Sequence, residues 1–162
     1  MKALTDKVKG RLNQEIARFF AAHHLGTGKP VSYDAFLEDR MLMISAIKAG
    51  ISYSLFDIIQ EITPFTESEW ADFLNISTKS LQRYRATANY RFKSLHSEKI
   101  LEMAEVTKVG VDVFGQLGKL KLWLNTPNYA LGNLKPLELL RDSYGKEMVI
   151  AELTRINHGI FV

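Results

Sequence analysis

The sequence predicts an all-α fold in three parts: an N-terminal helical extension over residues 1–48, a central helical domain over 49–110 and a C-terminal helical domain over 111–162. Two observations lead to this prediction. Apolar residues recur three and four positions apart in almost every segment, which is the spacing of one helix face. Glycine, proline, asparagine and serine separate these segments at short intervals. With 162 residues, the chain is long enough to bury a core in one domain or two small ones.

The N-terminal extension contains two predicted helices. The first ends near His24, because the breakers Gly26, Gly28 and Pro30 follow it. The second covers residues 33–49 and stops at Gly50. Their apolar faces are candidates for dimer contacts or for covering the central domain, and they comprise Leu4, Val8, Leu12, Ile16, Phe19, Phe20, Phe36, Leu37, Met41, Ile44 and Ile47.

Capping signals divide the central domain. Ser52 is suited to cap one helix, and Thr66 with Glu69 forms a capping box, in which the hydroxyl accepts a backbone N–H three residues on and the carboxylate reaches back. Asn75 and Ser77 form a turn after the helix that the box starts. The predicted helices cover residues 52–61, 67–74, 78–88 and 95–109, the last with an extension to residue 114 left open.

The C-terminal domain is divided by breakers. A helix over residues 116–124 precedes a loop at Pro127, and Gly132 marks a second loop. Pro136 suits the first turn of the next helix. Gly145 is expected to end that helix, and a final helix reaches about Asn157.

The composition excludes several classes of protein. The chain has no cysteine, which rules out disulfides, thiolate metal sites and cysteine nucleophiles. No apolar run is long enough to span a membrane, and residues 1–10 lack the continuous apolar core of a secretory signal. We therefore expect a cytoplasmic protein with no membrane partner. The net charge of +3 is mild, so the distribution of charge is more informative than the total.

No residue pattern points to catalysis, to a cofactor or to a metal. The segment from Thr27 to Pro30 resembles part of a phosphate-binding loop, but it lacks the first glycine, and proline stands where Ser or Thr would bind magnesium. His23 and His24 are adjacent, so they point to different faces of a helix and do not chelate one ion. No nucleophile–histidine–acid order or carboxylate pair stands out. We therefore expect a protein that is not an enzyme.

Residues 66–84 have the pattern of a helix-turn-helix. The crossing of the two helices needs a small residue, and Ala71 stands there. The turn favours a residue that tolerates positive φ, and Asn75 is the most tolerant type after glycine. Ser77 is placed to cap the second helix. The apolar anchors around the turn are Trp70, Leu74, Ile76, Leu81 and Tyr84.

The sign of the charge changes where the second helix of this motif begins. Residues 51–76 contain five acids and no Lys or Arg, whereas residues 78–99 contain six basic residues and one acid, Glu98. A recognition helix needs positive charge near phosphates, and Gln and Arg can read base edges. The alternative is a plain helical hairpin with a solvated basic face. The predicted DNA contacts are Thr78, Lys79, Gln82, Arg83 and Arg85.

Aromatic residues follow the predicted recognition helix. Tyr84, Tyr90 and Phe92 could offer a base-stacking platform, but helix-turn-helix proteins read duplex DNA, whose bases are already stacked. We therefore expect these three side chains to belong to the core. In the C-terminal domain we expect the core to contain Trp123, Leu124, Leu131, Leu140 and Leu153.

The C-terminal third contains an ordered set of motifs. LGKLKLWL at residues 117–124 is followed by TPNYALG at 126–132, PLELL at 136–140 and LTRINHGIFV at 153–162. Over residues 111–162 this order is similar to the toxin-binding domain of the Xre/MbcA/ParS family of bacterial antitoxins. Residues 49–110 resemble the Xre-like helix-turn-helix region of the same proteins.

The resemblance implies a type II antitoxin. The implied partner is a RES-domain toxin that degrades NAD⁺, and the antitoxin neutralises this toxin by covering the entrance to its active site. The complex is expected to repress its own operon by binding operator DNA. Because such readers bind paired half-sites, we expect a homodimer within a hetero-oligomeric toxin–antitoxin complex.

The end of the chain is the predicted inhibitory segment. Phe161 and Val162 offer apolar area worth about 1.5–3 kcal/mol each if fully buried, and the Val162 carboxylate could mimic a phosphate toward toxin arginines. Alternatively, these two residues fold back onto the chain's own core. Arg155 either contacts the partner or pairs with Glu152 three residues earlier. The predicted toxin contacts are Arg155, His158, Gly159, Ile160, Phe161 and Val162.

Two other functions compete with this one. The chain could be a transcriptional regulator whose C-terminal domain binds another protein, or only itself, and has no toxin partner. It could also be a protein-interaction module whose helix-turn-helix no longer binds DNA. A toxin gene beside the coding sequence would separate the first alternative from an antitoxin, and the effect of Arg83→Ala on promoter affinity would test the second.

Overall fold

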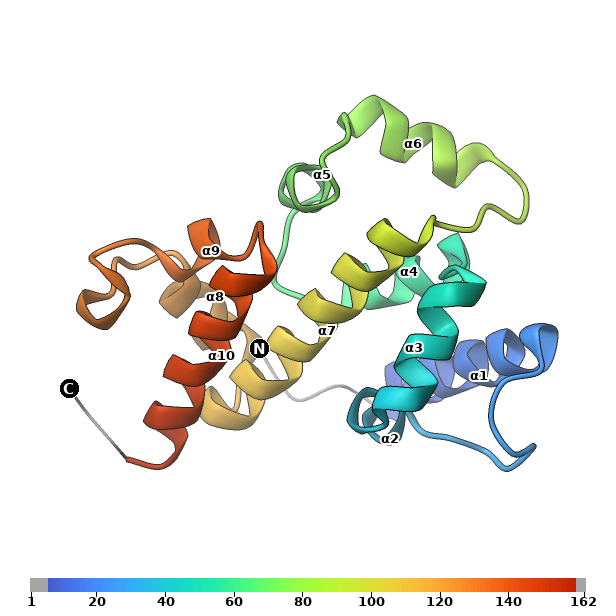
Figure 1. The fold of residues 1–162 in the computed structure, drawn as a ribbon, viewed down its shortest axis with the longest axis horizontal. Helices are drawn as coiled ribbons and strands as arrows, with labels where there is room; N and C mark the ends of the chain where they lie inside the picture. Colours follow the sequence, from blue (N-terminus) through green and yellow to red (C-terminus); the bar gives the residue numbers. More distant parts are fainter. Residues whose placement is uncertain (1–5, 160–162) are drawn as a thin grey trace.

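The computed structural model describes residues 6–159, and over this range it contains helices and connections but no strand (Figure 1). The predicted all-α fold is therefore confirmed. No helix in the described range is long and apolar enough to cross a membrane. The helices are α1 (Asp6–His23), α2 (Tyr33–Glu38), α3 (Arg40–Ala49), α4 (Tyr53–Glu61), α5 (Glu67–Leu74), α6 (Thr78–Ala86), α7 (Ser94–Phe114), α8 (Leu117–Leu124), the 3-10 turn η1 (Tyr129–Leu131), α9 (Pro136–Leu139) and α10 (Ser143–Asn157).

The 21-residue helix α7 lies at the centre of the molecule (Figure 1). It contacts α2, α3 and α5 of the preceding part of the chain and α8 and α10 of the part that follows. It continues without a break across residues 110 and 111 and ends where Gly115 adopts a left-handed conformation. Gly110 allows α8 to approach closely, because a Cβ at this position would lie 2.3 Å from Leu120 Cδ1. The central and C-terminal parts therefore share one helix and one connected apolar core.

Two helices replace the single one predicted over residues 33–49. The Asp39 carboxylate accepts a hydrogen bond from the Leu42 N–H at 3.1 Å and so caps a new helix, α3, directly after α2. This break changes which residues face inward. Phe36 and Leu37 are buried as expected, whereas Met41 and Ile44 are exposed. Phe19 and Phe20 of α1 are buried within this chain and are therefore not available for dimer contacts.

The predicted helix stop at Gly145 is wrong. Gly145 lies in the first turn of α10, and its N–H donates to the Asp142 carboxylate at 2.7 Å. The preceding helix, α9, has only four residues, because the chain turns at Leu140 and Asp142 caps the next helix. Glycine is required at position 145 for packing, since a Cβ there would lie 1.8 Å from the Leu139 carbonyl oxygen.

The predicted caps of the central domain are confirmed. The Ser52 and Ser77 hydroxyls accept backbone N–H groups at the starts of α4 and α6. Thr66 and Glu69 form the reciprocal capping box of α5. Asn75 adopts the left-handed conformation, with φ 54° and ψ 46°, at the end of α5. α6, the second helix of the helix-turn-helix, ends at Ala86, two residues earlier than predicted.

Polar contacts connect the two parts on either side of α7. Glu105 of α7 binds Lys146 of α10 at 3.0 Å and Arg40 of α3 at 2.8 Å. Burial alone would raise the pKa of Glu105, but the hydrogen bonds from Lys146 and Arg40 outweigh it and hold this pKa below its ordinary value. Arg141 also binds Asp72 of α5 at 2.9 Å.

Two glycine substitutions should have opposite effects on stability. Gly145→Ala should lower the free energy of unfolding by about 1–3 kcal/mol, because the new methyl group overlaps the α9 backbone. Gly10→Ala should raise it by about 0.5–1 kcal/mol, because Gly10 lies inside α1 with no atom near the new Cβ. Urea unfolding of both variants measures the difference. A Gly145→Ala protein as stable as the unmodified chain would contradict the packing described.

Asn75 should be replaceable by glycine but not by alanine. Asn75→Ala should lower the free energy of unfolding by about 1–2 kcal/mol, because alanine is strained in the left-handed conformation. Asn75→Gly adopts this conformation freely and should leave stability nearly unchanged. Thermal unfolding compares the two variants, and equal losses in both would exclude backbone conformation as the reason for asparagine here.

Candidate functional site

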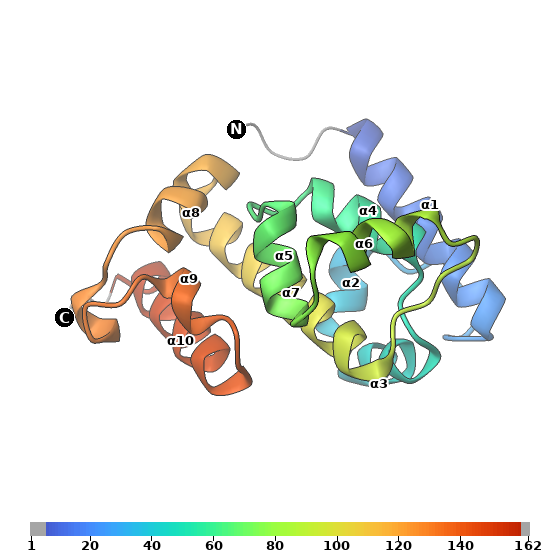
Figure 2. The ribbon, with the colours of Figure 1, turned by 90° about the horizontal axis from the view of Figure 1, so that it is seen from above.

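The helix-turn-helix is formed by α5 and α6, and its apolar anchors hold the two helices together. Trp70, Leu74 and Leu81 are buried, and so is Ala71 at the crossing. Ile76 and Tyr84 are half-buried against the same core. Leu81 is the one buried residue of α6. No other helix of the described chain covers α6 from above (Figure 2), so most of its surface is free for a partner.

Four of the five predicted DNA contacts lie on the exposed face of α6. Thr78, Lys79, Gln82 and Arg83 are all exposed, and the spacing places Lys79 and Arg83 on the side opposite Leu81, whereas Thr78 lies one turn before Leu81. The Arg83 guanidinium lies 5.6 Å from the centre of the Tyr84 ring. A face with these donors has the chemistry to contact phosphates and base edges.

Arg85 is placed differently from the other four. Its Nε donates to the Tyr53 hydroxyl at 3.3 Å, and its nearest carboxylate oxygen, on Glu67, is 3.9 Å away. The hydrogen bond with Tyr53 is the main cause that raises the pKa of Arg85 above its ordinary value. The side chain therefore turns toward α4 and away from the outward face of α6.

The aromatic residues after α6 form a stack on the core. Tyr84 and Tyr90 lie with ring centres 4.1 Å apart and nearly parallel, and Phe92 meets both edge-on. Phe92 is buried, as predicted, whereas Tyr84 and Tyr90 are only half-buried. Burial and a hydrogen bond with Tyr84 raise the pKa of Tyr90 to about 12. The stack covers one face of each tyrosine ring with the other ring.

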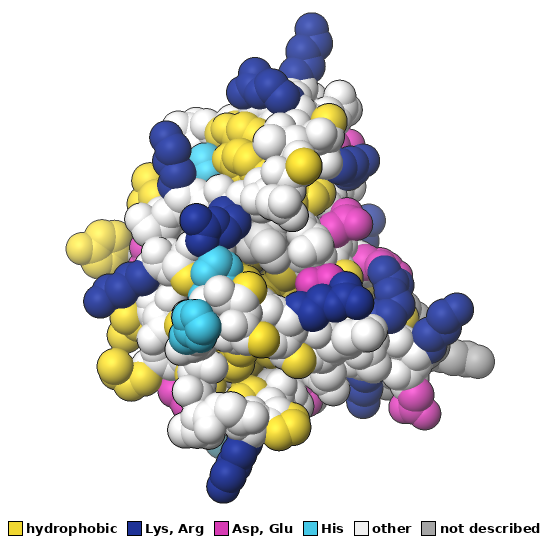
Figure 3. Space-filling view, turned by 90° about the vertical axis from the view of Figure 1, so that its right-hand side faces the viewer, with side chains coloured by type: hydrophobic (Ala, Val, Ile, Leu, Met, Phe, Trp, Pro, Cys, Tyr) yellow, Lys and Arg dark blue, Asp and Glu magenta, His cyan; other side chains and the backbone are white. Residues whose placement is uncertain are grey.

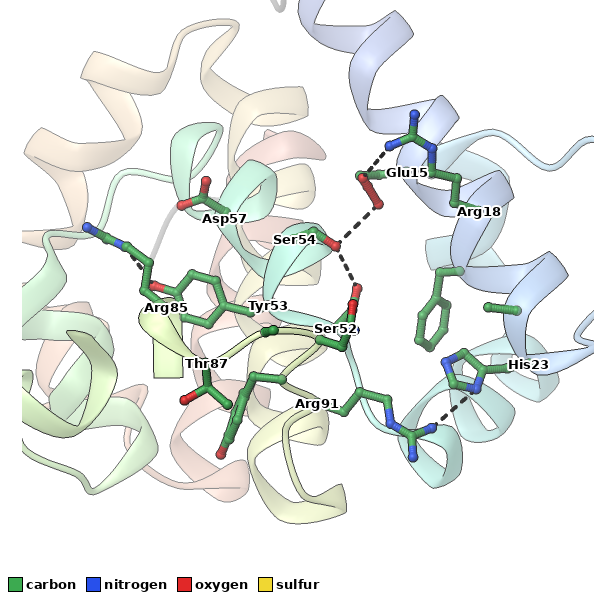
Figure 4. A pocket seen from close by; sticks show the side chains of 15 residues that line it. Glu15, Arg18, His23, Ser52, Tyr53, Ser54, Asp57, Arg85, Thr87 and Arg91 are labelled. Carbon is green, nitrogen blue, oxygen red and sulfur yellow. Dashed lines mark hydrogen bonds and ion pairs between the residues drawn. The ribbon is translucent and has the colours of Figure 1, made fainter. Parts of the chain in front are cut away.

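A polar hollow of about 740 Å³ lies beside the end of α6 (Figure 4). Its walls come from α1, from α4 and the residue before it, from the end of α6 and from the α6–α7 connection. Arg91 binds His23 Nδ1 at 3.4 Å and donates to the Ala49 carbonyl at 3.3 Å. Partial burial, and to a smaller extent Arg91, lowers the pKa of His23. A role for Arg91 and His23 could not be predicted from the sequence, because nothing in their spacing shows that α1 approaches the α6–α7 connection.

The C-terminal unit is built from α8, η1, α9 and α10. Leu124, Leu131, Leu140 and Leu153 are buried, as predicted, whereas Trp123 is only half-buried. The loops at Pro127 and Gly132 lie where the sequence predicted them. The Asn128 side chain accepts the Ala130 N–H at 2.8 Å, and Gly132 has a φ of 70°.

Exposed apolar side chains gather in this unit. Of the eight large hydrophobic residues that are exposed in the described chain, five lie between residues 122 and 148. Exposed apolar side chains are candidates for contacts with a protein partner. The five residues are Leu122, Tyr129, Leu134, Tyr144 and Met148, and none was predicted from the sequence as a toxin contact.

The predicted toxin contacts lie at and beyond the end of α10. Arg155 pairs with Glu152 one turn earlier, which was one of its two expected roles. His158 is exposed after the last turn, and Gly159 follows with a φ of 71°. Ile160, Phe161 and Val162 lie outside the described residues. Over residues 6–159, no group of three or more His, Asp or Glu side chains is placed to hold a metal ion.

The chain is similar to known antitoxins over both parts. Residues 110–159 match the family described as the antitoxin Xre/MbcA/ParS C-terminal toxin-binding domain, and residues 42–105 match the antitoxin Xre-like helix-turn-helix domain. The chain is 32% identical to "Antitoxin Xre" of Yersinia enterocolitica over 74% of this chain and 81% of the relative. It is 26% identical to "Prs ADP-ribosylating antitoxin" of Sphingobium over 73% of this chain and 79% of the relative.

A solved structure agrees with these relatives. One chain of the crystal structure of the M. tuberculosis MbcT–MbcA toxin–antitoxin complex superposes with a TM-score of 0.53 at 25% sequence identity. The match covers 66% of this chain and 94% of that chain. With its helix-turn-helix followed by the helical C-terminal unit, the chain belongs to the Xre/MbcA family of type II antitoxins.

Proposed function

We propose that this antitoxin neutralises a RES-domain toxin that degrades NAD⁺, and that it represses its own operon through the helix-turn-helix. In this proposal the C-terminal unit binds the toxin and residues 155–162 cover the entrance to the toxin's active site. The chain acts by binding and catalyses no reaction. It forms a homodimer within the toxin–antitoxin complex and so presents two recognition helices to paired half-sites.

The observation that carries the toxin-binding proposal is the position of the exposed apolar side chains. Leu122, Tyr129, Leu134, Tyr144 and Met148 all lie within residues 110–159, the range that matches the toxin-binding domain. Aromatic and Met side chains are enriched in the centres of protein interfaces. Arg155, which is partly exposed and already held by Glu152, lies in the same unit.

The exposed face of α6 supports the DNA-binding proposal. Lys79, Gln82 and Arg83 are exposed on α6, and no other helix of the described chain lies over α6 from above (Figure 2). α6 also contains no acid, so its charge favours phosphates along its whole length. The second candidate function, a transcriptional regulator without a toxin, shares this face and would use the apolar residues of the C-terminal unit to bind another protein or a second copy of the chain.

Co-expression with the protein encoded by the neighbouring gene tests the proposal. The full chain should restore growth and cellular NAD⁺. A chain without residues 159–162 should still bind this protein but should no longer protect. Leu122→Asp should weaken binding about tenfold or more, because a charge replaces an apolar contact. Purified mixtures and calorimetry measure this affinity.

Leu95→Asp is the matched control, because Leu95 is as exposed as Leu122 but lies at the start of α7. It should bind and protect like the unmodified chain. If the neighbouring protein is harmless alone, or if the full chain neither binds nor protects, the antitoxin proposal fails and the regulator without a toxin takes its place.

A further inference from the structure

Direct hydrogen bonding to a carboxylate divides the arginines of this chain into two groups. All eight lie within the described residues, and five of them bind a carboxylate directly. The other three are Arg83, Arg85 and Arg91, which lie within nine residues of α6 and the connection that follows. Arg85 has its nearest carboxylate oxygen at 3.9 Å. Guanidinium groups not directly bound to carboxylates are therefore confined to the neighbourhood of the recognition helix.

Neutral groups hold Arg85 and Arg91 in place. Arg85 is fixed by the Tyr53 hydroxyl, and Arg91 by a ring nitrogen of His23 and the Ala49 carbonyl oxygen. These contacts orient the guanidinium groups, and each group keeps further N–H donors. Among the described residues, Arg91 has no carboxylate within ion-pair distance, whereas Glu67 lies 3.9 Å from Arg85. An oriented arginine with uncompensated charge is suited to bind a phosphate, often with two hydrogen bonds.

The backbone of Arg91 is also fixed relative to the recognition helix. Ser52 and Arg91 form an isolated bridge, in which the Phe92 N–H donates to the Ile51 carbonyl at 2.8 Å and the Tyr53 N–H donates to the Tyr90 carbonyl at 2.9 Å. Gly50 permits this approach, since a Cβ there would lie 2.6 Å from the Phe92 carbonyl oxygen. The Tyr90 ring, stacked on Tyr84, connects the same segment to α6.

We infer that Arg85 and Arg91 bind backbone phosphates of DNA that passes the C-terminal end of α6. The hollow then forms a phosphate-binding surface beside the base-reading face. This inference rests on the proposed DNA binding. Figure 4 places the two guanidinium groups at opposite ends of the hollow, so they contact different phosphates. Arg83, on the outward face of α6, reads bases instead.

The other charged groups of the hollow show which end is more favourable for a phosphate. Glu15 is bound by Arg18 at 3.2 Å and also accepts from Ser54. Asp57 acts on Arg85, whose pKa it helps to raise. Arg91 therefore has the least compensated charge. The side of the molecule where the α6–α7 connection and the end of α1 lie has Lys and Arg side chains spread over it, with Asp and Glu side chains beside some of them (Figure 3).

Paired arginine substitutions test the inference. Arg91→Gln and Arg18→Gln each remove one positive charge from the same hollow, but only Arg91 lacks a carboxylate partner. Fluorescence anisotropy over a range of salt concentrations measures binding to a duplex from the chain's own promoter and to an unrelated duplex. Arg91→Gln should weaken binding to both duplexes by the same factor and reduce the slope of log K against log salt by about 1. Arg18→Gln should leave that slope unchanged.

Further variants separate the possible failures. Arg91→Lys keeps the charge and should keep the slope, whereas Arg85→Gln should reduce it as Arg91→Gln does. Arg83→Ala should lower the preference for the promoter duplex about tenfold, as expected of a base contact. If Arg83→Ala loses its preference for the promoter duplex while Arg91→Gln and Arg85→Gln keep the salt slope as Arg18→Gln does, the inferred phosphate contacts are wrong and the proposed DNA binding stands. If the unmodified chain does not prefer its promoter, the proposed repression fails as well.

Discussion

Packing on both sides of α7 is the constraint on which the remaining structure depends. Because α7 is packed against helices from both parts of the chain, its position relative to one part also sets its position relative to the other. Ile100, Leu101, Met103 and Val106 are buried within its length, and Gly110 admits Leu120 of α8 against its backbone. The polar contacts of Glu105 with Arg40 and Lys146 fix the positions of α3 and α10 relative to α7, because such contacts depend on direction and apolar packing does not. The helix-turn-helix and the C-terminal unit are thus held in one orientation.

This arrangement places the two proposed binding surfaces on different parts of the molecule. α6 is open above the core, while α8, η1, α9 and α10 form the opposite end in the same view (Figure 1). Arg141 and Asp72 connect the two ends, since Arg141 follows α9 and Asp72 lies in the first helix of the motif. A partner on the C-terminal unit would therefore lie near a contact that reaches the helix-turn-helix.

Local chemistry decided which features could be predicted from the sequence. The caps at Ser52, Thr66 and Ser77, and the left-handed turn at Asn75, depend on a few neighbouring residues, and the structure contains all of them. Asp39 was missed as a cap because the apolar spacing continues through it. Gly145 was misread because glycine can end a helix or allow close packing, and only the approach of α9 shows which applies. The hollow at Arg91 could not be predicted, since it depends on contacts between residues far apart in the chain.

The two tryptophans allow the most direct test of a shared core, because Trp70 lies in the helix-turn-helix and Trp123 packs on Phe114 at the end of α7. Trp123→Phe leaves Trp70 as the only indole fluorophore, and Trp70→Phe leaves Trp123. Urea unfolding of each variant would be followed by tryptophan fluorescence and by far-ultraviolet circular dichroism. If α7 joins both parts into one cooperative unit, the two signals coincide within each variant. A Trp123 transition at lower urea, with much of the helical signal remaining, would show that the C-terminal unit unfolds separately and would contradict this account.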